Sequence, residues 1–197
     1  MKQYIINTVT ELDWDKAETA KIDTFKWFTD YKPETYCKLL ALKDKGIAAK
    51  YFCHEKNPKA VYTKFYEDVY KDSCMEFFFA FKKGGKYVNC EMNSNGAALI
   101  GVGEERNNRV RLDKITNPPE VKAAVYENYW TVEVFFDIPT LQAIFGDISL
   151  EKGTVLYGNF YKCGDKTQHE HYGMWSEVGT DSPNFHCPEF FGELIIK

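Results

Sequence analysis

Residues 74–93 read CMEFFFAFKKGGKYVNCEMN, two apolar runs on either side of Gly84 and Gly85. Side chains of a β-strand point alternately to its two faces, so every second residue of a run lies on the same side. A two- or four-residue turn at the glycines aligns the apolar positions of both runs. We therefore expect a β-hairpin with one face in the core, formed by Met75, Phe77, Phe79, Phe81, Val88, Cys90 and Met92.

The opposite face of this hairpin carries Glu76, Phe78, Asn89, Glu91 and Asn93. A three-residue turn would place Met92 opposite Glu76 and mix apolar with polar positions, so the pattern disfavours it. A solvated surface is the simplest interpretation of these carboxylates and amides. The aromatic ring of Phe78 among them favours a surface that binds a ligand.

Short apolar runs separated by turn residues are typical of a β-sandwich or barrel. They cover residues 4–9, 17–22, 36–42, 47–54, 75–81, 87–93, 97–102, 109–115, 130–136, 154–162 and 189–196. One helix is expected over residues 139–145, between Pro139 at its start and Gly146 after its end. The sequence contains no repeat, low-complexity tract or charge block. It predicts one domain over residues 1–197, an all-β, antiparallel β-sandwich of the immunoglobulin-like or jelly-roll type with one short helix.

Composition narrows the classes of partner. The 13 Tyr and 15 Phe among 197 residues favour strands. The net charge of −4 and the lack of a basic stripe argue against nucleic acid as a partner. No apolar run approaches the ~20 residues of a membrane-spanning helix, so no membrane partner is expected. The first ten residues do not resemble a signal peptide, which predicts a cytoplasmic protein, or a secreted one if a signal segment has been removed.

The six cysteines contain no C-x-x-C motif, which argues against a zinc ribbon or a dithiol redox site. Residues 35–55 are expected to form a second hairpin that turns at Asp44, Lys45 and Gly46. A symmetric turn there places Cys37 directly opposite Cys53. We expect this pair to be reduced in a cytosolic protein, whereas a disulfide would imply export.

Several segments, taken in order, resemble the family 9 carbohydrate-binding modules, in particular the broad family 9-like group. The resemblance extends from about residue 16 to the end of the chain. It is carried by 57-NPKAVYT-63, 69-VYKDSCMEFF-78, 87-YVNCEMNSNG-96, 159-NFYKCGD-165, 172-YGMWS-176 and 185-FHCPEFFG-192.

This resemblance implies a β-sandwich that binds a saccharide without catalysis, in a site where two aromatic rings clamp the end of a glycan. Tyr70 and Phe185 fall at the two clamp positions, where better-characterised modules carry tryptophan. Glu76 matches the carboxylate that contacts sugar, and Asn93 matches a contacting amide. Glu91 stands where the binding modules typically carry arginine. Rings with a few planar polar groups suit sugars, which present apolar C–H faces and hydroxyl pairs.

Two other classes of function remain open. Glu76 and Glu91 provide a carboxylate pair, as glycoside-cleaving enzymes require, but they lie too close for an inverting arrangement. A transition-metal or haem site is the other alternative, because potential ligands gather late in the chain. These are Cys163, His169, His171, His186 and Cys187. The resemblance also implies that calcium can be present as a structural ion, although no Asp-rich loop marks a site.

Overall fold

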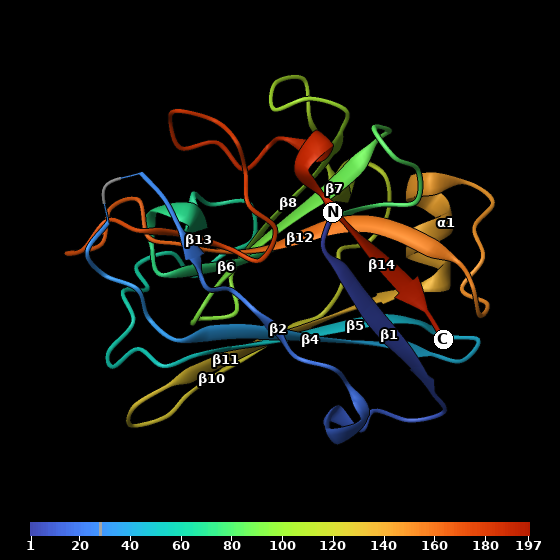
Figure 1. Cartoon of the computed structure of the whole chain (residues 1–197), viewed down its shortest axis with the longest axis horizontal. Coiled ribbons are helices and arrows are strands. Elements are labelled where there is room, and N and C mark those ends of the chain that lie inside the picture. The colour runs from blue at the N-terminus through green and yellow to red at the C-terminus, as the bar shows by residue number, and fades with distance from the viewer. Residues whose placement is uncertain (28) are drawn as a thin grey trace.

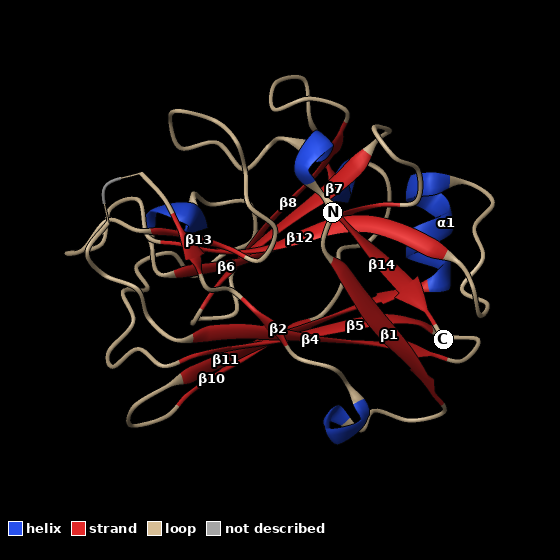
Figure 2. Ribbon diagram, in the orientation of Figure 1, coloured by secondary structure: helices blue, strands red, loops and turns tan. Residues whose placement is uncertain are grey.

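The computed structural model describes residues 1–27 and 29–197. Its strands form a single 14-stranded sheet that folds into two stacked layers (Figures 1 and 2). One layer contains β2 (Ala20–Lys21), β4 (Thr35–Leu42), β5 (Gly46–Cys53), β10 (Val121–Val125) and β11 (Trp130–Asp137). The other contains β3 (Thr24–Phe25), β6 (Cys74–Ala80), β7 (Tyr87–Asn93), β8 (Ala98–Gly103), β9 (Val110–Arg111), β12 (Val155–Cys163), β13 (Tyr172–Met174) and β14 (Gly192–Ile196).

Strand β1 (Gln3–Val9) joins the two layers. Its first residues pair with β14, from Gln3↔Glu193 to Ile6↔Ile196, and its last residues pair with β4, from Asn7↔Leu40 to Val9↔Leu42. Both pairings are parallel, whereas the other strand pairs of the described residues are antiparallel. The β-sandwich is therefore as expected, but its sheet is mixed.

The central hairpin has the expected register. Met75 pairs with Met92, Phe77 with Cys90 and Phe79 with Val88, and all of these residues are buried. Phe81 lies beyond the end of β6 and is only partly buried, packing at the edge of the core with its ring centroid 5.0 Å from that of Phe145. The alternation in the sequence is confirmed because a core on one side fixes the register of both strands.

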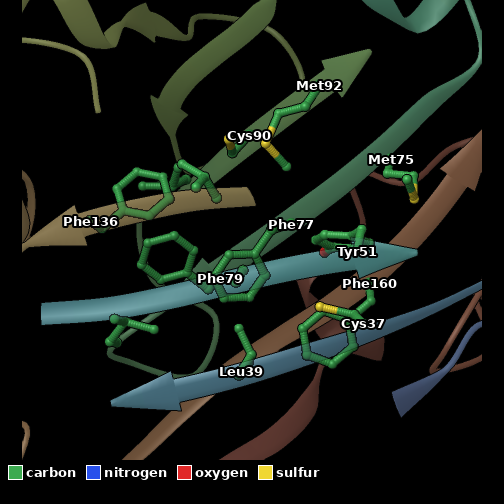
Figure 3. Packing of buried hydrophobic residues seen from close by; sticks show 14 of the residues in the cluster. Cys37, Leu39, Tyr51, Met75, Phe77, Phe79, Cys90, Met92, Phe136 and Phe160 are labelled. Carbon is green, nitrogen blue, oxygen red and sulfur yellow. The ribbon is translucent and has the colours of Figure 1, made fainter. Parts of the chain in front are cut away.

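Aromatic stacking fills the space between the layers. The rings of Phe77 and Phe79 lie 4.6 Å apart between centroids, and Phe160 of β12 lies 5.6 Å from Phe77 (Figure 3). Phe136 of β11 meets Phe79 edge-on at 5.2 Å from the facing layer. These rings make β6 the centre of the core.

The helix is also as expected, and several strands are shorter than the apolar runs. Helix α1 (Ile138–Phe145) begins at Asp137, whose side chain accepts a hydrogen bond from Thr140 N, and ends at Gly146 with a φ of 82°. Of the run 17–22 only Ala20–Lys21 is a strand, and the run 109–115 divides into β9 and a 3₁₀ turn, η3 (Leu112–Lys114). No helix in the described part of the chain is long and apolar enough to span a membrane.

The expected pairing of Cys37 with Cys53 is wrong. The turn between β4 and β5 is centred on Asp44, which has a positive φ of 57°, so Leu42 pairs with Gly46 and Cys37 pairs with Tyr51. Cys53 pairs with Thr35. The turn is centred one residue earlier than expected, on Asp44 instead of Lys45, so the partner of Cys37 moves by two positions. Both cysteines are free and buried.

A buried polar cluster also connects the layers. The ammonium of Lys162 lies 3.6 Å from Glu55 Oε2, donates to Ser73 Oγ at 2.9 Å and lies 2.6 Å from His171 Nε2. Trp130 Nε1 donates to the same Glu55 oxygen at 3.1 Å. Burial, and then the nearby Lys162 charge, lower the pKa of His171 to about 4. This imidazole is therefore neutral at physiological pH, and its Nε2 can accept a hydrogen bond from the Lys162 ammonium.

Candidate functional site

The polar face of the β6–β7 hairpin lies under loops. It forms one side of a cavity of about 430 Å³, hereafter the β6–β7 cavity. The hairpin contributes Glu76, Asn89 and Glu91, and the surrounding segments add Tyr70, Arg106 and Phe185. The solvated-surface interpretation is therefore wrong for the three hairpin residues, because Glu76, Asn89 and Glu91 are buried beneath these loops.

A second hollow of about 640 Å³ lies over the loop after β8 and one side of α1. Its lining is built from aliphatic, charged and amide side chains such as Val102, Glu104, Asn107 and Ile144. The β6–β7 cavity instead combines aromatic rings with convergent polar groups, the combination expected of a small-molecule site.

Glu76 and Glu91 form a directly opposed pair on β6 and β7, hereafter the acid pair. Their exposed fractions are 3% and 5%. The thiol of Cys163 donates to Glu76 Oε1 at 3.0 Å, and Asn89 Nδ2 donates to Glu91 Oε1 at 2.7 Å. Glu91 Oε2 is buried without a hydrogen-bond partner among the described residues. Like charges directly opposite each other in a sheet are destabilising, so two ionised carboxyl groups at these positions would be unfavourable.

Burial is the main cause of the altered acidity in this cavity. It raises the pKa of the Glu91 carboxyl to about 7. Burial, and then the neighbouring Glu91 charge, raise the pKa of Glu76 well above its ordinary value. Asp165, at the side of the cavity, also has a raised pKa because partial burial removes water from its carboxyl. The acid pair therefore binds a proton at neutral pH instead of carrying two full charges.

Asn89 and Arg109 hold the acid pair in place. Asn89 bonds Glu91 through its amide nitrogen, and its Oδ1 accepts from Arg109 Nε at 2.6 Å. Arg109 also donates to the carbonyls of Glu105, Tyr87 and Gly101, and its guanidinium lies 4.1 Å from the centroid of the Tyr87 ring. A Cβ atom at Gly101 would come within 2.6 Å of Asn89 Oδ1, so glycine leaves room for this network.

The aromatic side of the cavity contains both expected clamp residues. Phe185 is 8% exposed and stacks on Tyr161 of β12, with 4.1 Å between centroids and 12° between ring planes. Tyr70 lies in the 3₁₀ turn η2 (Val69–Lys71) and is partly buried, with the Lys71 ammonium 5.6 Å from its ring centroid. Both rings line the same cavity, so the structure brings them together with Glu76 and Glu91.

Asn93 lies on the expected face of β7 but does not line the cavity. It is fully buried, its Nδ2 donates to Tyr62 O and Asp72 Oδ2, and its Oδ1 accepts from the backbone N–H groups of Asn95 and Ala97. These bonds use its amide to hold the turn after β7 and the segment around Tyr62. Asn89, four residues earlier on the same face of β7, lines the cavity instead.

The histidines and cysteines near the C-terminal end do not form, in the part of the chain that the structure describes, the metal site that the sequence left open as an alternative. Among the described residues, one group of three potential ligands comes within 4.8 Å of one another: Cys74, Glu76 and Cys163. His171 bonds Lys162, and His186 Nδ1 bonds the hydroxyl of Tyr87 at 2.9 Å. The structure therefore gives separate roles to residues that the sequence suggested as a cluster.

Asp72 Oδ1, which is also buried without a hydrogen-bond partner among the described residues, is the other candidate oxygen for a structural calcium ion. The ammonium of Lys59 lies 3.7 Å from this oxygen and donates to the carbonyls of Lys71 and Lys166 at 2.9 and 3.0 Å. Because a fixed ammonium already provides positive charge to these acceptors, calcium does not fit here.

Sequence reasoning missed several residues of the cavity. Asn89 shares the alternation of Glu91 and could have been selected from it. Arg106 and Arg109 follow β8 in a charged loop without periodic pattern, and Arg109 was expected to begin a strand. Asn184 and His186 also line the cavity, and no spacing connects them with the hairpin.

Comparison with known proteins identifies the class. Residues 7–196 match the carbohydrate-binding family 9, so the chain belongs to this family. A search of curated proteins found no significant match.

Solved structures agree with this assignment. The chain is similar to a Bacteroides uniformis protein provisionally assigned as carbohydrate-binding, with 26% identity, a TM-score of 0.84 and coverage of 100% of this chain and 99% of that one. It also resembles a family 9 module from Caldicellulosiruptor kristjanssonii, solved in complex with glucose and with cellotriose. Those two structures share 13% identity and a TM-score of 0.69 with this chain; they cover 100% of it, and the matches extend over 96% and 94% of their own lengths. At that identity they show the β-sandwich fold alone.

Proposed function

We propose that this protein binds a saccharide, a glycan end or a small sugar, in the β6–β7 cavity and does not cleave it. One observation carries the proposal: a single cavity contains the rings of Tyr70 and Phe185 together with the Glu76 and Glu91 carboxyls. Membership of the carbohydrate-binding family 9 supports it. The family 9 module with glucose and cellotriose bound supports the same class of ligand.

Each group has a role that its chemistry suits. The Tyr70 and Phe185 rings stack on the apolar C–H face of a sugar. Glu76 and Glu91 bond its hydroxyl groups, accepting when ionised and donating when protonated. Asn89 holds Glu91 in position, and the sugar contact expected of Asn93 is not part of this proposal because Asn93 does not line the cavity. The exposed guanidinium of Arg106 provides a donor at the rim.

The arrangement of the acid pair argues against glycoside cleavage. The two carboxyl groups that act in glycosidases flank the scissile bond. Glu76 and Glu91 are neighbours on adjacent strands and approach a ligand from the same side. Their side chains start roughly 4.5–5.5 Å apart at Cβ, which is too close for the inverting arrangement. This spacing does not by itself argue against a retaining enzyme, whose carboxyl groups lie closer together, but the approach of both groups from one side, instead of flanking the bond, does.

Replacing the Tyr70 ring tests the binding proposal. We expect Tyr70→Ala to weaken saccharide binding by about 1–3 kcal/mol, measured by calorimetry against glucose and short glucans, while leaving the fold intact. Unchanged affinity in this variant would contradict the stacking role.

Catalysis is tested separately with aryl glycosides and oligosaccharides. We expect no product from the wild-type protein. Product release that disappears in Glu76→Gln would instead assign the acid pair as catalytic acid and base.

A further inference from the structure

The acid pair lacks a positively charged partner. Glu76 and Glu91 face each other across β6 and β7, and both are buried. None of the ion pairs formed by the described residues includes either carboxyl. Buried charges in proteins are normally paired, so this arrangement leaves a position for a cation.

The unpaired oxygen points to where that cation would lie. Glu91 Oε1 is held by Asn89, but Glu91 Oε2 is buried in the cavity lining without a partner among these residues. On the opposite strand, Glu76 Oε1 is occupied by the Cys163 thiol. The acid pair therefore keeps unused acceptor capacity, and the neighbouring amide and thiol fix the orientation of its carboxyl groups.

The arginines of the cavity do not fill this position. The guanidinium of Arg109 is committed to Asn89 and to three backbone carbonyls. Arg111 pairs with Asp113, at 2.6 Å between Nη2 and Oδ2. Arg106 lies exposed at the rim. A cation that replaces the proton held by the acid pair at neutral pH would therefore come from the ligand.

We propose that the β6–β7 cavity prefers an amino sugar, a saccharide carrying a primary ammonium, with that ammonium between Glu76 and Glu91. This inference rests on the proposed function and narrows its ligand class. An ammonium offers three donors around one compact charge, which suits acceptors on two adjacent strands. The sugar ring remains free to stack against Tyr70 and Phe185, and a volume of about 430 Å³ is within the range of small-ligand sites.

Calorimetric titration with three matched sugars at about pH 7 tests the preference. Glucosamine carries the ammonium, glucose carries a hydroxyl in its place, and N-acetylglucosamine carries a neutral amide. We expect glucosamine to bind at least about tenfold more tightly than either of the others, because charge-assisted hydrogen bonds are stronger than neutral ones. Equal affinities, or tighter binding of glucose, would overturn the inference.

Two variants show whether the preference comes from the acid pair. Glu91→Gln keeps the size of the side chain and removes its charge, so glucosamine should lose more affinity than glucose does, and the preference for glucosamine should fall to less than about threefold. Glu151→Gln changes an exposed carboxyl in a turn and should keep the full preference. A preference that persists in Glu91→Gln would refute the assigned position of the ammonium.

The titrations also distinguish a failure of the amino-sugar inference from a failure of the proposed saccharide binding. If glucose and cellotriose bind but glucosamine gains nothing, the amino-sugar preference is wrong and saccharide binding stands. If the folded wild-type protein binds none of these sugars or short glucans, saccharide binding itself is refuted, and this inference with it.

Discussion

Glu91→Gln should make the empty protein more stable at high pH. Burial raises the pKa of this carboxyl from its ordinary value of 4.5 to about 7 in the folded state. A carboxyl whose pKa is higher in the folded state binds its proton more tightly there, which stabilises the fold. This stabilisation is fully present when the pH is below the pKa of the unfolded state, and it is lost as the pH rises to the pKa of the folded state. At about 1.36 kcal/mol for each tenfold change in acidity, the wild-type protein loses about 3 kcal/mol between about pH 4.5 and pH 8.

Glutamine removes this loss because it does not ionise. Its amide can also donate to Glu76, which no longer faces a like charge. Urea unfolding followed by tryptophan fluorescence should give nearly equal unfolding free energies for the two proteins at about pH 5. At about pH 8 the variant should be more stable by about 1–3 kcal/mol, since burial of the amide offsets part of the gain.

The same substitution at an exposed carboxyl provides the control for the pH dependence of unfolding. Glu151→Gln should follow the wild-type stability curve at every pH, since its side chain is exposed. If the curves of the wild-type and Glu91→Gln proteins run parallel from pH 5 to pH 8, the two carboxyls do not share a desolvated site, and the reasoning about the acid pair fails.

Three further substitutions test the surrounding structure by denaturant unfolding. Phe185→Ala should lower the unfolding free energy by about 3–5 kcal/mol as well as weakening sugar binding, because the ring is buried; a stable variant would mean that the ring is not part of the core. Lys162→Met should lower it by about 3–5 kcal/mol by leaving Glu55 without its buried cation, and an unchanged value would show that this ion pair is dispensable. Asp137→Ala removes the cap of α1 and should lower it by about 1 kcal/mol, with no loss expected if solvent satisfies the helix end equally well.

The β6–β7 hairpin was predictable because two features of its sequence, the alternation of apolar residues and the position of the glycine turn, indicate the same register. Alternation assigned Met75, Phe77 and Phe79 to the core, and the glycine turn aligned them with Val88 and Cys90. The second hairpin lacked this agreement. Either centre of the turn keeps Cys37 and Cys53 on the same face of the sheet, so the apolar pattern could not choose between them, and the positive φ of Asp44 decided the register.

The cavity was only partly predictable for a related reason. Alternation selects a face of a strand but does not say which loops cover each end of it. Asn89 and Asn93 share one face of β7, yet loops enclose Asn93 in backbone hydrogen bonds while Asn89 reaches the cavity. The covering residues Arg106 and Asn184 come from irregular segments, where spacing along the chain carries no information about distance in space, whereas Phe185 could be placed only through the family resemblance.

The parallel pairing of β1 with β14 has a mechanical consequence. Because the strands run side by side from Gln3↔Glu193 to Ile6↔Ile196, a force that pulls the first residue away from the last draws them past each other along their length. The hydrogen bonds between them are then strained together in shear, and they cannot open one at a time from an end. Stretched between its termini, this protein should resist forced unfolding more strongly than when it is pulled across the β10–β11 hairpin at the sheet edge, whose pairs can separate in sequence.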